Sequence, residues 1–286
     1  MERKPDWLKA EYNNESIDEM NEMLSTLNLN TVCNEAACPN RGECYRKHTA
    51  TFLILGANCT RHCRFCNVTQ ACPKPIDQNE PNNIAEATQR LGLRHVVITS
   101  VTRDDLPDGG AAHFANVTGA VKKTNIHTTV ELLIPDLQGN EAALKTVLEA
   151  SPDILVHNLE TVPRLYSQVR PEADYLRSLN VLKNAKKYSS SVITKTGIML
   201  GLGETKDEVI DLIEDVVKAD CDIMTIGQYL RPSKEHLPVV EYINPDIFSE
   251  YADIGKTMGI RYVYSAPLVR SSYNASDAYH AIKYGV

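Results

Sequence analysis

Seven short apolar runs recur along this chain, and amphipathic stretches separate them. The runs are rich in Val, Ile and Thr, and they span residues 51–57, 95–101, 127–135, 153–160, 192–200, 222–227 and 261–267. Continuous apolar runs of this length are typical of strands that are buried on both faces of a parallel sheet. Their alternation with helical stretches predicts right-handed β-α-β units, and therefore an α/β fold.

Two of the intervening stretches carry clear helix signals. Thr205 and Glu208 have the spacing of a capping box, in which each side chain bonds the backbone amide of the other residue. Apolar residues then recur at helical spacing and predict a face that packs on the sheet. A second helix is expected to start at Asn244-Pro245 and to end before Gly259, which can adopt a left-handed cap.

The number of units limits the architecture. A complete eight-unit barrel takes about 250 residues, but the first 50 residues do not follow the pattern, which leaves about six units. The sequence therefore predicts a partial (β/α)6 TIM-type barrel with an N-terminal and a C-terminal extension. We expect the boundaries to give segments 1–48, 49–265 and 266–286. A doubly wound open sheet is the alternative, because strand spacing alone does not exclude it.

Charge and composition restrict the partners and the location. The chain of 286 residues has a net charge of −7, which argues against general binding of nucleic acid or of an anionic membrane surface. No apolar run approaches the roughly 20 residues of a membrane span. Residues 1–16 lack the apolar stretch of a secretory signal. We therefore expect a cytoplasmic protein with no nucleic-acid and no membrane partner.

Seven of the eight cysteines fall between residues 33 and 72. A disulfide framework is not expected in a long chain without a secretory signal, so metal binding or redox chemistry is the better interpretation. Cys59, Cys63 and Cys66, the downstream trio, follow the first predicted strand, where the active-site loops of parallel α/β folds lie. Iron–sulfur clusters take about one thiolate per iron, so three cysteines would leave one iron of a cubane open for a ligand. Zinc with a distant fourth ligand is the alternative.

The spacing of the downstream trio resembles that of the radical S-adenosylmethionine (SAM) enzymes. In that superfamily the amino and carboxylate groups of SAM chelate the open iron. An electron from the cluster then cleaves the sulfonium to give methionine and a 5′-deoxyadenosyl radical. The residue before the last cysteine is usually aromatic there, and Phe65 fits.

Cys33, Cys38 and Cys44, the upstream trio, precede the predicted barrel at a spacing that suits zinc poorly. Two such trios joined by a short apolar strand resemble the lipoyl synthases over nearly the whole chain. The matching stretches are CNEAACPNRGEC, GANCTRHCRFCNV, TSVTRDDLPDGGA, HNLETV, TKTGIMLGLGE, TIGQYLRPS and RSSYNA. In that family the upstream trio holds an auxiliary [4Fe–4S] cluster, whose fourth ligand is a serine of the RSSY motif. Ser272 matches that serine.

The resemblance also implies a SAM pocket at the strand ends. The expected contacts are Phe65, Ser100, Arg103, Asn158, Glu160, Arg177 and Lys195. Asn158 and Glu160 end the fourth strand, where an amide and a carboxylate suit ribose hydroxyls. Lys195 and Arg177 are the candidates for the methionine carboxylate. Without the resemblance, Glu160 would be interpreted as a solvated loop carboxylate and Lys195 as a surface charge.

The reaction that the resemblance implies is a sulfur transfer. Its substrate is an octanoyl group on a lysine of the lipoyl domains of 2-oxoacid dehydrogenase complexes or of the glycine-cleavage H protein. Two sulfur atoms enter at C6 and C8, two SAM are consumed, and the auxiliary cluster supplies the sulfur. The expected catalytic residues are Cys59, Cys63, Cys66 and Ser272, and the expected cofactors are two [4Fe–4S] clusters and SAM.

The resemblance also implies further partners, and two alternative functions remain open. An electron donor such as flavodoxin or ferredoxin and an iron–sulfur carrier that rebuilds the cluster are implied. Cys72 and Cys221 are not expected to be ligands. The alternatives are a sulfur-inserting enzyme of the biotin-synthase type and a non-catalytic iron–sulfur electron carrier.

Overall fold

One eight-stranded sheet organises the chain. The computed structural model describes residues 4–9, 14–46 and 49–285, and its main sheet has the order β1-β2-β5-β6-β7-β8-β9-β10. Its strands are β1 (Asn30–Thr31), β2 (Thr51–Ile54), β5 (His95–Ser100), β6 (Thr129–Leu133), β7 (Ile154–Val156), β8 (Ile193–Leu200), β9 (Ile223–Gln228) and β10 (Tyr262–Ser265). β1 pairs with β2 in antiparallel fashion, and the other neighbours are parallel. The seven predicted runs are the seven parallel strands.

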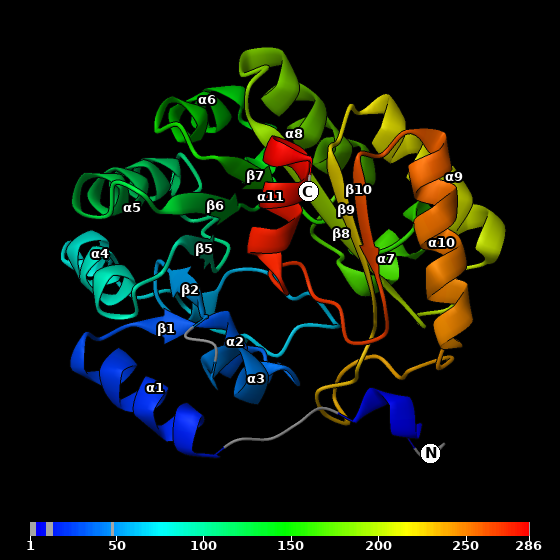
Figure 1. The fold of residues 1–286 in the computed structure, drawn as a ribbon, viewed down its shortest axis with the longest axis horizontal. Coiled ribbons are helices and arrows are strands. Elements are labelled where there is room, and N and C mark those ends of the chain that lie inside the picture. Colours follow the sequence, from blue (N-terminus) through cyan, green and yellow to red (C-terminus); the bar gives the residue numbers. More distant parts are fainter. Residues whose placement is uncertain (1–3, 10–13, 47–48, 286) are drawn as a thin grey trace.

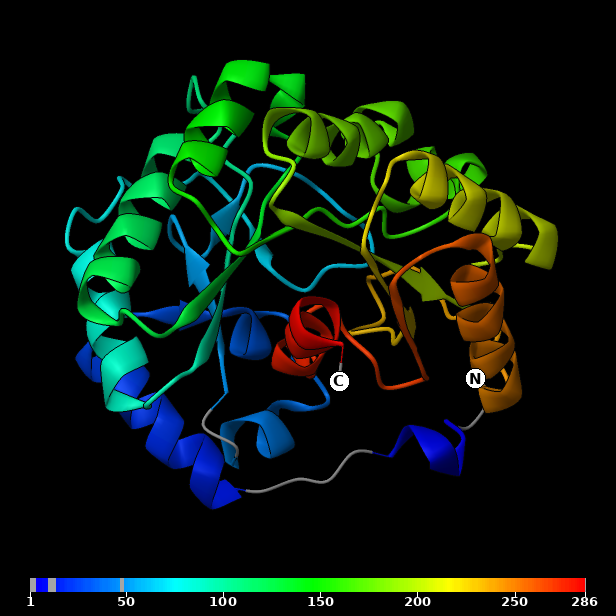
Figure 2. The ribbon, with the colours of Figure 1, turned by 45° about the horizontal axis from the view of Figure 1, so that its top comes forward.

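Helices alternate with these strands and cover the outer face of the sheet (Figure 1). They are α4 (Glu80–Arg90), α5 (Ala111–Thr124), α6 (Glu141–Glu149), α8 (Tyr175–Tyr188), α9 (Lys206–Lys218) and α10 (Pro245–Met258). Figure 2 shows them as an arc outside the strands. Helices on one side only give a partial barrel, as the sequence predicts, and not a doubly wound sheet.

The remaining elements, apart from the last helix, lie outside this alternation of strands and helices. They are η1 (Asp6–Leu8), α1 (Asn14–Thr26), α2 (Val32–Glu35), α3 (Arg41–Arg46), η2 (Leu137–Gly139), η3 (Pro163–Leu165) and α7 (Tyr166–Val169). Two short strands, β3 (Asn58–Cys59) and β4 (Thr69–Gln70), form a separate parallel pair. β1 joins the main sheet, so part of the predicted N-terminal extension completes its edge.

The two predicted helix signals are confirmed. Thr205 and Glu208 form a complete capping box at the start of α9. The buried residues of α9 then face the sheet and include Val209, Ile213 and Val216. Gly259 ends α10 with φ of 113°, a left-handed conformation that glycine adopts without strain.

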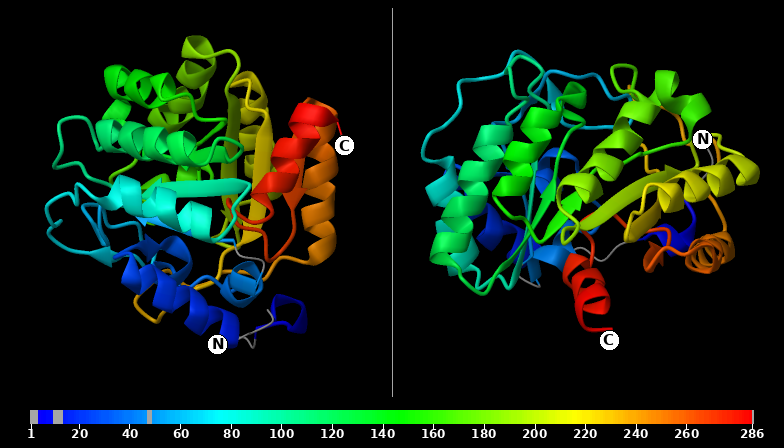
Figure 3. Two further views of the ribbon diagram at one scale, coloured as in Figure 1. Left: turned by 60° about the vertical axis from the view of Figure 1, so that its left-hand side comes forward. Right: turned by 90° about the horizontal axis from the view of Figure 1, so that it is seen from above.

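The last helix, α11 (Ala275–Tyr284), covers the end of the barrel at which the strands begin. Its Ala278 is buried with Ile154, Ile193 and Ile223, the first residues of β7, β8 and β9. In Figure 2, α11 lies in the middle of the arc of helices, and in the right-hand view of Figure 3 it stands out from the barrel. The opposite end of the strands is therefore left for the loops that follow them.

Candidate active site

A cavity of about 550 Å³ lies where the parallel strands end. All six cysteines of the two trios line it, together with Ser271 and Ser272. The carboxyl ends of strands are where parallel barrels carry their active sites. The structure therefore brings together the two cysteine patterns and the RSSY motif that the sequence holds far apart.

The downstream trio lies on the loop that follows β2. The amide of Cys66 donates to the Cys63 carbonyl at 3.1 Å, and the amide of Thr102 donates to the Cys59 sulfur at 3.3 Å. Burial raises the pKa of Cys63 to about 11, although the charge of Arg170 opposes this, and burial raises the pKa of Cys66 to about 12. Both free thiols are therefore protonated at neutral pH, and binding of iron must displace their protons.

Two short helices place the upstream trio. Cys33 lies in α2, Cys44 lies in α3, and Cys38 lies in the turn between them. Burial, and then the neighbouring Cys38, raise the pKa of Cys33 to about 11. Burial also raises the pKa of Cys38, and the guanidinium of Arg270 opposes this. A cation from the RSSY motif thus lies close enough to the trio to stabilise its thiolates.

The segment 266–273, between β10 and α11, reaches the upstream helices. Asn40 Nδ2 donates to the Leu268 carbonyl at 2.7 Å. The Tyr273 hydroxyl donates to the Glu43 carboxylate at 3.0 Å. These bonds hold the RSSY motif beside the turn and helix that carry Cys38 and Cys44.

The same segment also runs close against β9. A Cβ on Gly227 would lie 2.1 Å from the Val269 carbonyl oxygen, so this strand position has no room for a side chain. A Cβ on Gly197, the fifth residue of β8, would lie 2.6 Å from Thr225 Oγ1 and 3.2 Å from Ser271 Oγ. Glycine at both positions lets the RSSY motif enter the cavity wall.

A polar wall faces the same cavity. Asn158 Nδ2 donates to the Glu160 carboxylate at 3.0 Å and to the Ser271 hydroxyl at 2.7 Å. Arg170 donates to the Asn158 carbonyl at 2.8 Å. Burial raises the pKa of Glu160, although Arg170 and Asn158 oppose this. The sequence analysis missed Ser271, which the RSSY motif could have indicated, and Arg170, for which we find no local signal.

Several polar atoms of this wall lack a partner. Ser100 Oγ, His157 Nε2, Asn158 Oδ1 and Arg170 Nε are buried without a hydrogen bond to any described residue, and all four residues line the cavity. Buried polar atoms are normally paired. The cavity therefore combines thiols, which suit iron, with free donors and acceptors, which suit a polar ligand such as SAM.

Comparison with known proteins shows to which family the chain belongs. The sequence profile of the Radical SAM superfamily matches residues 53–216. A lipoyl synthase of Caldanaerobacter subterraneus subsp. tengcongensis is 57% identical over 273 residues, which cover 96% of each chain. One of Caldicellulosiruptor saccharolyticus is 55% identical over 276 residues, which cover 96% of this chain and 97% of the relative.

The chain belongs to the lipoyl synthase family. Its function is therefore lipoyl synthesis, and it is a radical SAM sulfurtransferase, for which a [4Fe–4S] cluster and SAM are the cofactors. This confirms the resemblance and sets aside both alternatives, the biotin-synthase type and the non-catalytic electron carrier.

Solved structures support the fold of this lipoyl synthase family member. Methylornithine synthase aligns with a TM-score of 0.53 at 14% identity, over 86% of this chain and 81% of that chain. The Streptococcus suis protein SuiB bound to SAM aligns with a TM-score of 0.61 at 12% identity, over 94% and 66%. At these identities the likeness concerns the fold alone, and it confirms the partial barrel. No helix in the described part of the chain is long and apolar enough to cross a membrane.

Lys195, a SAM contact expected from the lipoyl synthase resemblance, lies outside the residues that line the cavity. Its side chain is 1% exposed, and its Nζ donates to Glu131 at 2.8 Å. Lys195 is the third residue of β8, and the β8 residues that line the cavity, Gly197, Ile198 and Met199, come after it. Lys195 lies on a strand of the barrel as expected, and its contact with SAM stays a prediction.

Arg103 and Arg177 also lie outside the residues that line the cavity. Arg103 pairs with Asp105 at 2.8 Å, and Arg177 donates to Asp136 at 2.8 Å. Local carboxylates therefore engage both guanidinium groups, and a SAM contact of either residue stays a prediction. The remaining expected SAM contacts line the cavity, namely Phe65, Ser100, Asn158 and Glu160. Cys72 and Cys221 lie outside the cavity lining, and the expectation that they are not ligands stays a prediction.

Proposed function

We propose that the chain inserts two sulfur atoms, at C6 and C8, into an octanoyl group on a lysine of a lipoyl domain or an H protein. The observation that carries this proposal is that two cysteine trios and the RSSY serines share one cavity. When bound there, SAM and the two clusters supply a carbon radical able to take hydrogen from an unactivated C–H bond, and the sulfur itself. The chain's own residues bind and orient these groups and exclude water from them.

Cys59, Cys63 and Cys66 would hold the first cluster, to which SAM would bind. Ser100, Asn158 and Glu160 position the nucleoside and amino-acid parts of SAM. Arg170, which the sequence analysis missed, joins them, because its Nε is buried and unpaired among the described residues that surround the cavity. Phe65 adds an apolar contact beside the last cysteine, and its ring packs on the second half of the barrel.

Cys33, Cys38, Cys44 and Ser272 hold the auxiliary cluster. Ser272 lines the cavity with these cysteines, and the neighbouring Arg270 is placed to offset thiolate charge at Cys38. An alkoxide is a harder ligand than a thiolate and is easily protonated. A serine ligand therefore gives this cluster one weak attachment, which suits a cluster that surrenders its sulfur.

The octanoyl chain lies between the two sites. The cavity walls there carry apolar side chains such as Leu53, Val68 and Val101, which exclude water from a reactive radical. The partners we propose are an octanoylated carrier domain, a reductant such as flavodoxin or ferredoxin, and an iron–sulfur carrier. The cytoplasmic location predicted from the sequence stays a prediction.

Product mass spectrometry tests this assignment. The chain is reconstituted anaerobically with iron and sulfide, then given SAM, a strong reductant and an octanoyl-lysyl peptide. We expect a peptide that gains two sulfur atoms and the release of 5′-deoxyadenosine. An unchanged peptide would contradict the substrate assignment, and absence of 5′-deoxyadenosine would contradict the radical chemistry.

Cysteine variants in the same assay assign the two trios. Cys63→Ala should form no 5′-deoxyadenosine, whereas Cys38→Ala should form it without adding sulfur. Ser272→Ala should keep SAM cleavage and impair the product. Cys72→Ala is the matched control, because this thiol is exposed and does not line the cavity. Lipoyl product from Cys38→Ala would overturn the auxiliary site.

A further inference from the structure

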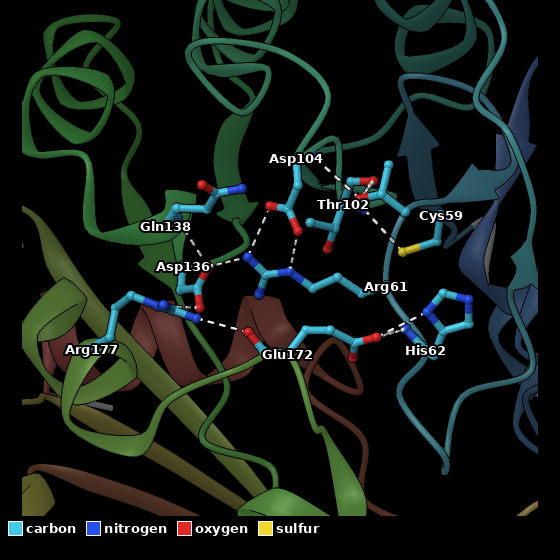
Figure 4. A network of polar contacts seen from close by, with 10 residues as sticks. Cys59, Arg61, His62, Thr102, Asp104, Asp136, Gln138, Glu172 and Arg177 are labelled. Carbon is cyan, nitrogen blue, oxygen red and sulfur yellow. Dashed lines mark hydrogen bonds and ion pairs between the residues drawn. The ribbon is translucent and has the colours of Figure 1, made fainter.

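One buried guanidinium ties the loop of the downstream trio to two neighbouring strand ends (Figure 4). Arg61, between Cys59 and Cys63, is 4% exposed. Its Nε and one terminal nitrogen donate to Asp104 at 2.6 and 2.9 Å, and the same terminal nitrogen donates to Asp136 at 2.6 Å. Asp104 follows β5 and Asp136 follows β6, so one side chain joins three loops.

The backbone beside Arg61 is ordered by the segment after β5. The Thr60 amide and hydroxyl both donate to the Thr102 carbonyl, at 3.1 and 3.0 Å. The Asp104 amide in turn donates to the Thr60 hydroxyl at 3.1 Å, and the Thr102 amide donates to the Cys59 sulfur. Part of the TSVTRDDLPDGGA stretch thus lies alongside the first half of the downstream loop and holds it.

Asp136 is itself fixed from several sides. It accepts from the Gln138 amide at 3.1 Å and from Arg177 at 2.8 Å. Leu137 and Gln138 have φ of 48° and 52°, and such strained conformations persist only where the surroundings enforce them. Burial alone would raise the pKa of Asp136, but the hydrogen bonds and charge of Arg61 outweigh burial and hold that pKa well below its usual range. Asp136 therefore stays ionised at physiological pH.

We propose that Arg61 is a positioning residue, and that its pairing with Asp104 and Asp136 fixes the loop of the downstream trio in its cluster-binding shape before a cluster binds. This inference rests on the proposed role of the downstream trio as cluster ligands. A guanidinium that bonds a carboxylate through two nitrogens fixes orientation as well as distance, which a lysine ammonium does not. Residues that follow β5 and β6 of the barrel thus order the loop of the downstream trio.

Three variants separate this role from general stability. Asp104 is not one of the proposed cluster ligands. Asp104→Asn keeps the size of its side chain and removes its charge. Arg61→Lys keeps the charge and removes the two-nitrogen geometry. Arg164→Gln is the matched control, because Arg164 makes the same kind of pair with Glu208, at 2.6 and 2.9 Å, on the surface and outside the cavity lining.

Hydrogen–deuterium exchange of the metal-free chain is the first measurement. We expect peptides covering residues 58–66 to exchange about five-fold faster in Asp104→Asn and Arg61→Lys, with α9 unchanged. The control should exchange like the parent chain over residues 58–66, and any faster exchange at the start of α9 in this control comes from Glu208, which loses its partner. Unchanged exchange of residues 58–66 would overturn the proposal. Equal acceleration in α9 would also overturn it, because the network would then act on global stability alone.

Spectroscopy of the reconstituted chain is the second measurement. We expect Asp104→Asn to release iron to a chelator faster and to weaken the change that SAM causes in the electron paramagnetic resonance spectrum of the reduced protein. A variant with a looser loop but with the parental spectrum and release rate would overturn the proposal. Failure of the proposed function is seen separately, since the parent chain would then form no 5′-deoxyadenosine.

Discussion

A charged pair is buried inside the barrel, away from the residues that line the cavity. Lys195 and Glu131 are each 1% exposed, and the second oxygen of Glu131 lies 3.1 Å from His95 Nε2. Burial would raise the pKa of Glu131, but the charge of Lys195 and the bond to His95 reverse this and lower it. Glu131 therefore stays ionised inside the barrel.

Removing one partner of this pair should be costly. Lys195→Met leaves the Glu131 carboxylate buried without its main counter-ion, so we expect the free energy of unfolding to fall by about 3–5 kcal/mol in urea titrations. The double variant Lys195→Met/Glu131→Gln should regain most of that loss. A double variant no more stable than Lys195→Met alone would show that the charge on Glu131 is not the cause.

A buried histidine gives the fold a dependence on pH. His157 is 2% exposed, and its Nδ1 donates to the Ile134 carbonyl at 2.9 Å. Burial, and then the charge of Arg170, lower its pKa from 6.5 to about 4. Between those two values the unfolded chain binds a proton that the folded chain does not, so stability falls as the pH falls through this window.

The size of this effect can be measured by substitution. We expect His157 to account for roughly 2–3 kcal/mol of the stability lost between pH 6.5 and 4, at about 1.4 kcal/mol per pH unit. Urea titrations of the parent chain and of His157→Gln at pH 7, 5.5 and 4.5 give the free energy of unfolding of each. The difference between the two chains at each pH cancels the contribution of the other titratable groups. Parallel stability profiles for the two chains would contradict the assignment.

At the scale of elements, the position of a residue relative to its strand end determines whether its side chain lines the cavity. The long apolar runs predicted β2 and β5 to β10, because burial on both faces leaves a continuous signal in the sequence. β1, β3 and β4 have two residues each, which is too short for any periodicity. The contact between β9 and the RSSY segment could not be predicted from the sequence either, since it depends on two backbone segments that meet only in the folded chain.

That contact makes Gly227 a sensitive position. Gly227→Ala places a methyl group against the Val269 carbonyl, so the RSSY segment must move and carry Ser272 with it. We expect the iron retained after anaerobic reconstitution to fall toward that of Cys38→Ala, while 5′-deoxyadenosine is still formed. Gly119→Ala is the control, because a Cβ there meets nothing within 4 Å. Full iron content and lipoyl product in Gly227→Ala would refute the expectation.

At the scale of the whole molecule, α11 closes the end of the barrel opposite the cavity. Ala278→Arg would force a cation among Ile154, Ile193 and Ile223. We expect about 3 kcal/mol or more of lost stability, or failure to fold, because a buried unpaired charge is strongly unfavourable. Lys283→Glu, on the exposed side of the same helix, should stay within about 0.5 kcal/mol in the same urea titration. Equal stability of the two variants would place α11 away from the barrel.

Much of the candidate site could be predicted because its cysteines lie close together in sequence. Cys59, Cys63 and Cys66 occupy one loop, so their spacing carries the information. The carboxylates that pair with Arg103, Arg177 and Lys195 were not predicted, because a guanidinium or ammonium pairs with whichever carboxylate the fold brings near it. No sequence pattern reports those carboxylates, which is also why the network around Arg61 was missed.

The open barrel also has a mechanical consequence. Its end strands, β1 and β10, do not pair in the described sheet, and the gap is bridged by side-chain bonds from Asn40 to Leu268 and from Tyr273 to Glu43. Strand pairs elsewhere share several backbone bonds that must break together. Under tension, for example in a single-molecule pulling experiment, we therefore expect the barrel to open first between β1 and β10. The upstream trio lies beside this opening.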